Sequence, residues 1–169
     1  MNGSPTLRQV ALGDFEHELA STRRALERVP AEHLSWRPHP RSMSLGMLAF
    51  HIANIVMWQR SIVQTDEYDF AAGPPPRTDD PATTGEILEH FDANAAAVRA
   101  ELQGTDDAAL NRQWTLRSGE HVIARATKAQ MLRGFDISHL IPHRGQLTVY
   151  LRLLDLPVPS MYGPTADEG

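Results

Sequence analysis

Apolar residues recur at intervals of three and four positions in four separate stretches of the chain, and this spacing constrains the fold more than any other feature. Such a period places the apolar side chains on one face of an α-helix. The stretches cover approximately residues 6–29, 44–65, 83–104 and 127–154. Because a helix with one apolar face is stable only when that face is packed, the pattern predicts an all-α protein, an antiparallel four-helix bundle.

Local signals define where these stretches begin and end. Thr83 and Thr127 each stand three residues before a Glu or Gln, which is the pattern of a capping box at a helix start. Pro30 ends the first stretch, because proline disfavours the helical conformation of the residue before it. Gly104 ends the third, and the run Gly73-Pro-Pro-Pro that follows the second cannot be helical.

Two longer connections, residues 66–82 and 105–126, separate the predicted helices. The second favours a short helical turn around residues 106–110, followed by a small hairpin or ordered loop at a Ser-Gly turn. We expect these irregular connections to cross over the bundle or to cover one end of it. Since the proline-rich run is too short to be a domain linker, we expect a single domain over residues 1–169.

The composition excludes several classes of function. There is no cysteine, so disulfides, thiolate metal sites and a cysteine nucleophile are excluded. The net charge is −5, without a dense basic run, and we therefore expect no nucleic-acid partner. No apolar stretch is long enough to span a membrane, and the first residues lack the apolar segment of a secretory signal. The expected location is the cytoplasm, with no membrane partner.

Histidine is the reactive residue type that stands out, with eight copies. His139 and His143 are four residues apart on the inward stripe of the last predicted helix, where two imidazoles lie close enough to share a metal ion. A polar group on such a stripe needs a partner. Two interpretations are therefore open, a metal site and a pair of core histidines that hydrogen-bond to neighbouring groups.

His51 is the best candidate for a third ligand. It lies within roughly 60° of Leu48 and Ile55 on the helical wheel, beside the apolar stripe of the second predicted helix. A lone histidine in such a place also has a purely structural explanation. The other five histidines are assigned no role, because His17 and His90 have charged neighbours and His33, His39 and His121 lie in the connections.

Two motifs resemble the DinB family. The run HLIPHRGQLTVYLRLL at residues 139–154, with the tail that continues to Gly163-Pro164, is similar to the last helix and tail of that family. The segment Ser35-Trp-Arg-Pro, followed by residues 42–51, resembles the family's entry into its second helix, which carries a single histidine. The resemblance covers nearly the whole chain.

This resemblance implies a DinB-like four-helix bundle, frequently a homodimer, that holds nickel or zinc through one histidine of the second helix and two of the last. The corresponding residues here are His51, His139 and His143. Related proteins include transferases and isomerases that use glutathione, bacillithiol or mycothiol. Pro142 departs from the family pattern, which often has another residue there. Because proline removes a hydrogen bond and kinks a helix, it puts in question whether the side chains of His139 and His143 point to the same place.

Three neutral imidazoles leave a divalent ion with its full charge and an open position, and such an ion lowers the pKa of a bound water or thiol. Since the chain has no cysteine, a thiolate would come from a low-molecular-weight thiol cosubstrate. Two functions stay open. One is a metal-dependent thiol transferase or hydrolase acting on a small molecule. The other is a non-catalytic, metal-stabilised stress or interaction protein.

Two residues that follow the histidine pair have open or peripheral roles. Gln146, one turn beyond His143, either orients a metal-bound ligand or makes a hydrogen bond between packed helices. No catalytic residue is assigned. Arg144 is expected at the surface or in a subunit contact.

Overall fold

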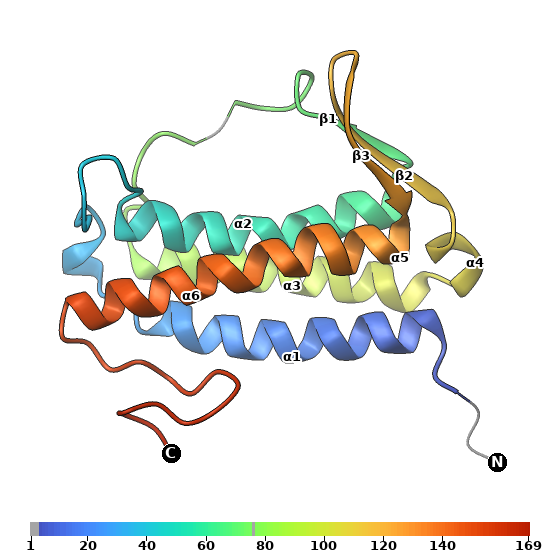
Figure 1. The fold of residues 1–169 in the computed structure, drawn as a ribbon. Helices are drawn as coiled ribbons and strands as arrows, with labels where there is room; N and C mark the ends of the chain where they lie inside the picture. The colour runs from blue at the N-terminus through green and yellow to red at the C-terminus, as the bar shows by residue number, and fades with distance from the viewer. Residues whose placement is uncertain (1–3, 76) are drawn as a thin grey trace.

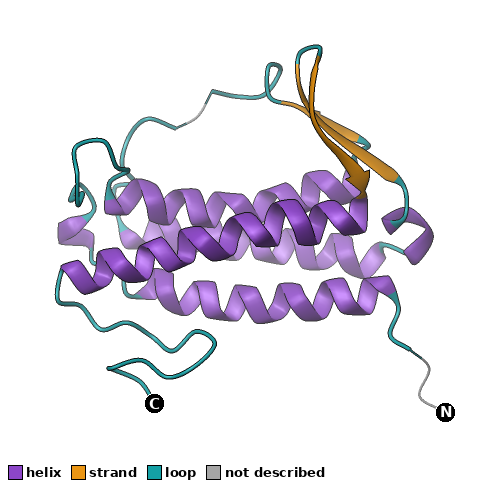
Figure 2. Cartoon of the chain, viewed as in Figure 1, coloured by secondary structure: helices purple, strands orange, loops and turns teal. Residues whose placement is uncertain are grey.

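The computed structural model describes residues 4–75 and 77–169, which form a four-helix bundle with a small sheet at one end (Figures 1 and 2). The bundle helices are α1 (Leu7–Glu27), α2 (Leu45–Gln64), α3 (Thr84–Gly104) and α6 (Ser138–Leu153). A short 3₁₀ helix, η1 (Ala31–His33), lies between α1 and α2. The strands are β1 (Glu67–Asp69), β2 (Gln113–Ser118) and β3 (His121–Thr127). The predicted four-helix bundle is confirmed.

The directions of the helices follow from the long connection between α2 and α3. The described parts of this connection, residues 65–75 and 77–83, return along the length of the bundle before α3 begins (Figure 1). As a result α2 and α3 run in the same direction, and α1 and α6 run in the opposite one. α2 packs against α3 and α6, and α1 packs against the same two helices. The neighbours α2 and α6, which carry the three singled-out histidines, are therefore antiparallel.

The predicted apolar stripes form the core of the bundle. Each helix contributes fully buried side chains, among them Leu19 and Leu26, Ile52 and Ile55, Phe91 and Val98, and Leu147 and Leu151. Burial of one such side chain stabilises the fold by about 1.5–3 kcal/mol. Within the described ranges, none of the helices combines the length and the apolarity that crossing a bilayer requires.

Side-chain caps begin the helices at the predicted positions. The Thr127 hydroxyl accepts a hydrogen bond from the Gln130 amide and the Gln130 side chain accepts one from the Thr127 amide, so this capping box is complete. The Thr83 hydroxyl likewise accepts from the Glu86 amide at 3.0 Å. The Glu86 carboxylate, however, accepts from the amide of Ala82 rather than from that of Thr83, so the second box is only half formed.

The connection between α3 and the last helix contains both features that the sequence favoured. It forms the one-turn helix α4 (Asp107–Leu110) and the hairpin of β2 and β3. Gly119 in the hairpin turn has φ +57°, a conformation that glycine adopts without strain. The sequence did not predict β1, which pairs parallel with β2 through Glu67 and Thr115. The three strands stand together at the end of the bundle where α2 finishes (Figure 2).

The last predicted helix is present but not uniform. It consists of α5 (Lys128–Met131), a π-helical segment η2 (Leu132–Ile137) and α6. π-Helical segments are rare and frequently occur at functional sites. The sequence analysis missed this segment, because an apolar spacing of four residues does not distinguish the two kinds of helix. α6 continues through Pro142 without a break.

Candidate metal centre

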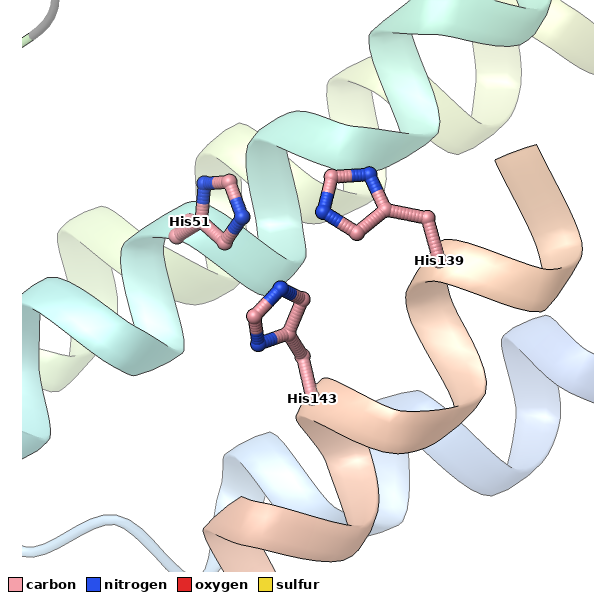
Figure 3. A group of neighbouring side chains, drawn as sticks. All are labelled: His51, His139 and His143. Atoms are coloured by element: carbon pink, nitrogen blue, oxygen red, sulfur yellow. The ribbon is translucent and has the colours of Figure 1, made fainter. Parts of the chain in front are cut away.

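Three histidines from two helices meet in the middle of the bundle wall. His51 comes from α2, and His139 and His143 come from α6 (Figure 3). The centroid of the His51 ring lies 5.3 Å from that of His139 and 4.7 Å from that of His143. One ring nitrogen from each residue lies within 4.8 Å of the other two. The structure thus brings together the three residues that the sequence singled out.

The backbone positions these side chains by helix geometry alone. His139 and His143 are one turn apart, and their ring centroids are separated by 4.9 Å. Antiparallel packing of α2 on α6 places His51 opposite both of them. Pro142 is exposed to solvent, and α6 continues through it. The proline therefore does not turn the rings of His139 and His143 away from each other, which was the question that the sequence raised.

The environment keeps these imidazoles in the form that binds metals. Burial, together with the neighbouring rings of His143 and His139, lowers the pKa of His51 to about 4. Burial and the proximity of His143 also lower the pKa of His139. Both rings are therefore neutral at pH 7, with a nitrogen lone pair available, as metal coordination requires. All three side chains are only half-buried, so the cluster stays within reach of small molecules.

Gln146 holds the ring of His143. Its Oε1 lies 2.8 Å from Nδ1 of His143. A carbonyl oxygen can only accept, so Nδ1 carries the proton and Nε2 keeps the lone pair. Outer hydrogen bonds of this kind fix the tautomer and orientation of metal-binding histidines. Gln146 therefore contacts a candidate ligand directly and is placed to orient it.

Within the described part of the chain, the cluster contains three candidate ligands. Among the residues that the structure describes, no further His, Asp or Glu joins the group. Three protein ligands with an open position are typical of catalytic zinc sites, whereas structural sites have four.

Comparison with known proteins places the chain in a family. A model of the DinB family matches residues 7–169. The chain belongs to the DinB family. Among curated relatives, the uncharacterized protein YrdA of Bacillus subtilis (strain 168) is 29% identical over 163 residues, covering 93% of this chain and 89% of YrdA.

Solved structures of DinB-like proteins share the fold. One from Bacillus cereus ATCC 10987 has a TM-score of 0.69 at 23% identity and covers 90% of this chain and 95% of its own. The DinB-like protein YjoA from Bacillus subtilis has a TM-score of 0.69 at 19% identity, with coverages of 92% and 99%. These likenesses confirm the DinB fold predicted from the resemblance.

His90 differs from what its charged neighbours indicated. It was assigned no role because of these neighbours, but the ring is half-buried and stacks on Phe50 at 4.7 Å between centroids. Its Nε2 lies 3.2 Å from Oδ1 of Asn54 and 3.1 Å from Nδ2 of Asn94. The guanidinium of Arg77 covers the Phe50 ring at 4.4 Å. These contacts give His90 a structural role between α2 and α3.

Arg144 was assigned to the surface or a subunit contact, and that prediction is wrong. Its side chain is 2% exposed and forms an ion pair of 2.7 Å with Glu18 of α1. The guanidinium also donates to the Thr22 hydroxyl and to the Tyr162 hydroxyl of the C-terminal tail. A buried arginine needs partners of this kind, because an unpaired buried charge is strongly destabilising. Arg144 therefore joins α6, α1 and the tail inside this DinB protein.

The sequence analysis also missed a fully buried carboxyl group. Asp136 of η2 is 0% exposed, and its Oδ2 accepts a hydrogen bond of 2.5 Å from Nε2 of Gln59 on α2. Its Oδ1 has no hydrogen-bond partner within the described residues. Burial raises the pKa of Asp136 to about 8, although the bond from Gln59 acts in the opposite direction. The one available signal was Gln59, a polar residue on the predicted apolar stripe.

Proposed function

We propose that His51, His139 and His143 hold one divalent metal ion, nickel or zinc, and that this DinB protein is an enzyme acting on a small molecule. A bound ion of this kind supplies a Lewis-acid centre with a position for an exchangeable ligand. The reaction that we propose is transfer of a low-molecular-weight thiol to an electrophile, or hydrolysis.

The donor set supports the proposed ion. Imidazole nitrogens suit zinc and nickel. The three ring nitrogens lie within 4.8 Å of one another, and Zn–N bonds of about 2.0–2.1 Å would draw them closer together. Burial keeps His51 and His139 neutral. The hydrogen bond between Gln146 and Nδ1 of His143 leaves the other ring nitrogen, Nε2, free to bind the ion. Each residue of the set is thus prepared to donate an electron pair.

The observation that carries the enzymatic proposal is the number of protein ligands in the cluster, which is three. A protein that used metal only to join α2 to α6 would gain from a fourth protein ligand. The described residues supply three, and these are half-buried rather than enclosed. Because the chain has no cysteine, a thiol partner has to come from outside the protein. We also propose that the protein forms a homodimer and that it is located in the cytoplasm.

Metal analysis of purified protein tests the site. We expect about one divalent ion per chain, and we expect each of His51→Ala, His139→Ala and His143→Ala to lose it. His121→Ala is the matched control, because this histidine is exposed on β3 and should retain full occupancy. Full occupancy in all three cluster variants would reject the assignment.

A second experiment tests turnover. The metal-loaded protein is screened with several small thiols against alkylating and ester electrophiles, and we expect a rate that a chelator abolishes. His51→Ala should lack this rate while keeping its helical circular dichroism, because the aliphatic stripes build the core. Loaded protein with no metal-dependent rate above background would favour the non-catalytic, metal-stabilised stress or interaction protein.

A further inference from the structure

A run of aromatic rings extends outward from the histidine cluster. The Phe135 ring of η2 lies 6.0 Å from that of His139, and the Trp58 ring of α2 lies 6.3 Å from Phe135. Tyr68 and Phe70 follow at 4.4 Å and 5.2 Å from Trp58. We call Phe135, Trp58, Tyr68 and Phe70 the aromatic wall. It joins α2, the β1 region and η2, and it begins beside a candidate metal ligand.

The aromatic wall is not part of the closed core. Core rings such as Phe15 and Phe91 are 1% exposed. Phe70 is 44% exposed, and the other three rings of the wall are only half-buried. Apolar surface left in water costs free energy in proportion to its area, about 25 cal/mol per Å². Clustered exposed aromatic surface of this kind marks binding sites.

Strand β1 holds two of these rings in fixed positions. Its side chains alternate, so that Glu67 and Asp69 both form ion pairs with Arg117 of β2, at 2.8 Å and 2.5 Å. Tyr68 then points to the opposite face, where it meets Trp58. The backbone amide of Phe70 donates to the carbonyl of Arg117 at 2.9 Å, which fixes the residue that follows the strand.

Gly73 lets the chain close tightly behind Tyr68. A Cβ at this position would collide with the Tyr68 hydroxyl, so the glycine permits a contact that a larger residue would prevent. β1 lies above the C-terminal part of α2, on which Trp58 stands (Figure 1). The wall is therefore organised before any ligand arrives, which reduces the entropy lost on binding.

We propose that the aromatic wall is a binding subsite for an uncharged, planar apolar group, such as a phenyl ring, of the molecule on which the metal centre acts. This inference rests on the proposed function, because the donor atom of the same molecule occupies the metal's open position. The charged side chains of β1 are paired with Arg117 on the other face of the strand. The face beside the histidines presents rings, which select flat apolar groups through stacked and edge-to-face contacts.

Two thiols of different shape test this subsite on cobalt-loaded protein. Ethanethiol and benzyl mercaptan carry the same donor group, and only the second carries a ring. Binding is followed by the visible and near-ultraviolet absorption of Co²⁺, which requires no turnover. We expect benzyl mercaptan to bind at least about fivefold more tightly, an advantage in the range of one favourable ring–ring contact.

Matched variants assign the preference to the wall. In Phe135→Ala the ratio of the two affinities should fall towards one, while the affinity for ethanethiol stays unchanged. Phe135 is the ring of the wall that lies beside His139, at 6.0 Å between centroids, and it is only half-buried. Leu153→Ala removes an apolar side chain that is 58% exposed on α6, outside the wall, and should keep the wild-type ratio.

The outcomes separate the two proposals. Equal affinities for the two thiols in wild-type protein, or an unchanged ratio in Phe135→Ala, would overturn the subsite and leave the metal centre intact. The wall would then serve only to pack β1 on α2. If neither thiol changes the absorption of bound cobalt, or no cobalt binds, the proposed function fails and the subsite fails with it.

Discussion

Replacement of Asp136 by asparagine should flatten the dependence of stability on pH above neutrality. The carboxyl group has a pKa of about 8 in the folded protein, raised from an ordinary value of 3.8 by complete burial. Between these two values the folded protein binds one proton more than the unfolded chain. The free energy of unfolding therefore decreases as the pH rises, by about 1.4 kcal/mol per pH unit, until the pKa of the folded state is reached.

The magnitude follows from this linkage. From pH 6.5 to pH 8 the ionisation of Asp136 should lower the free energy of unfolding by about 1.6 kcal/mol, since the slope halves as the pH reaches the folded pKa. Over the same window His51, whose pKa is lowered from 6.5 to about 4, raises the free energy of unfolding by only about 0.4 kcal/mol, and it does so equally in wild type and variant. Its own effect is a loss of stability as the pH falls from 6.5 to 4. In Asp136→Asn the loss assigned to Asp136 should disappear, because the amide does not ionise.

Urea unfolding followed by circular dichroism measures this difference. The experiment uses metal-free protein in chelator, so that metal binding does not contribute to the pH dependence. Asp92→Asn is the control, because Arg23 lowers the pKa of that surface carboxyl and it stays ionised throughout the window. Parallel stability profiles for wild type and Asp136→Asn from pH 6.5 to 8 would refute the argument from burial.

Three further predictions concern the centre and its surroundings. Removal of metal should lower the melting temperature by several degrees in a thermal scan, since a ligand at about a hundredfold excess over its Kd stabilises the folded state by about 2.7 kcal/mol; coincident curves with and without chelator would count against a metal that joins α2 and α6. Gln146→Ala should weaken metal binding about 10- to 100-fold in a chelator competition without loss of fold, because the exposed amide orients His143; an unchanged Kd would contradict this role. Arg144→Met leaves the Glu18 carboxylate buried beside an apolar side chain, and urea unfolding should show a loss of about 3–5 kcal/mol. A loss below about 1 kcal/mol, the value typical of a surface pair, would show that Arg144 is not buried as described.

The parts of the fold that the sequence predicted are those encoded by neighbouring residues. The aliphatic stripes, the Thr127 cap and the Ser-Gly turn act within a few positions of one another, so periodicity and turn chemistry locate them. Strand β1 has only three residues and exists because β2 is beside it. Nothing in its own sequence distinguishes it from a loop.

The candidate centre was predictable because its ligands interrupt apolar patterns and match a family motif. Arg144 was not, because its partners Glu18 and Tyr162 lie far away in sequence and a buried arginine looks locally like an exposed one. Asp136 was missed for a similar reason. Its burial depends on the π-helical turn, and its hydrogen-bond partner is Gln59 of α2.

The distribution of the three histidines along the chain sets when this protein can acquire its proposed metal. His51 is made early, whereas His139 and His143 lie in the last fifth of the sequence. At about 5–20 residues per second, a ribosome needs several seconds to pass from the first ligand to the others, and α6 must then dock on α2. A single imidazole cannot retain the ion during that interval. Metal loading is thus a step that follows synthesis, and metal content reports the fraction of chains that have completed the bundle.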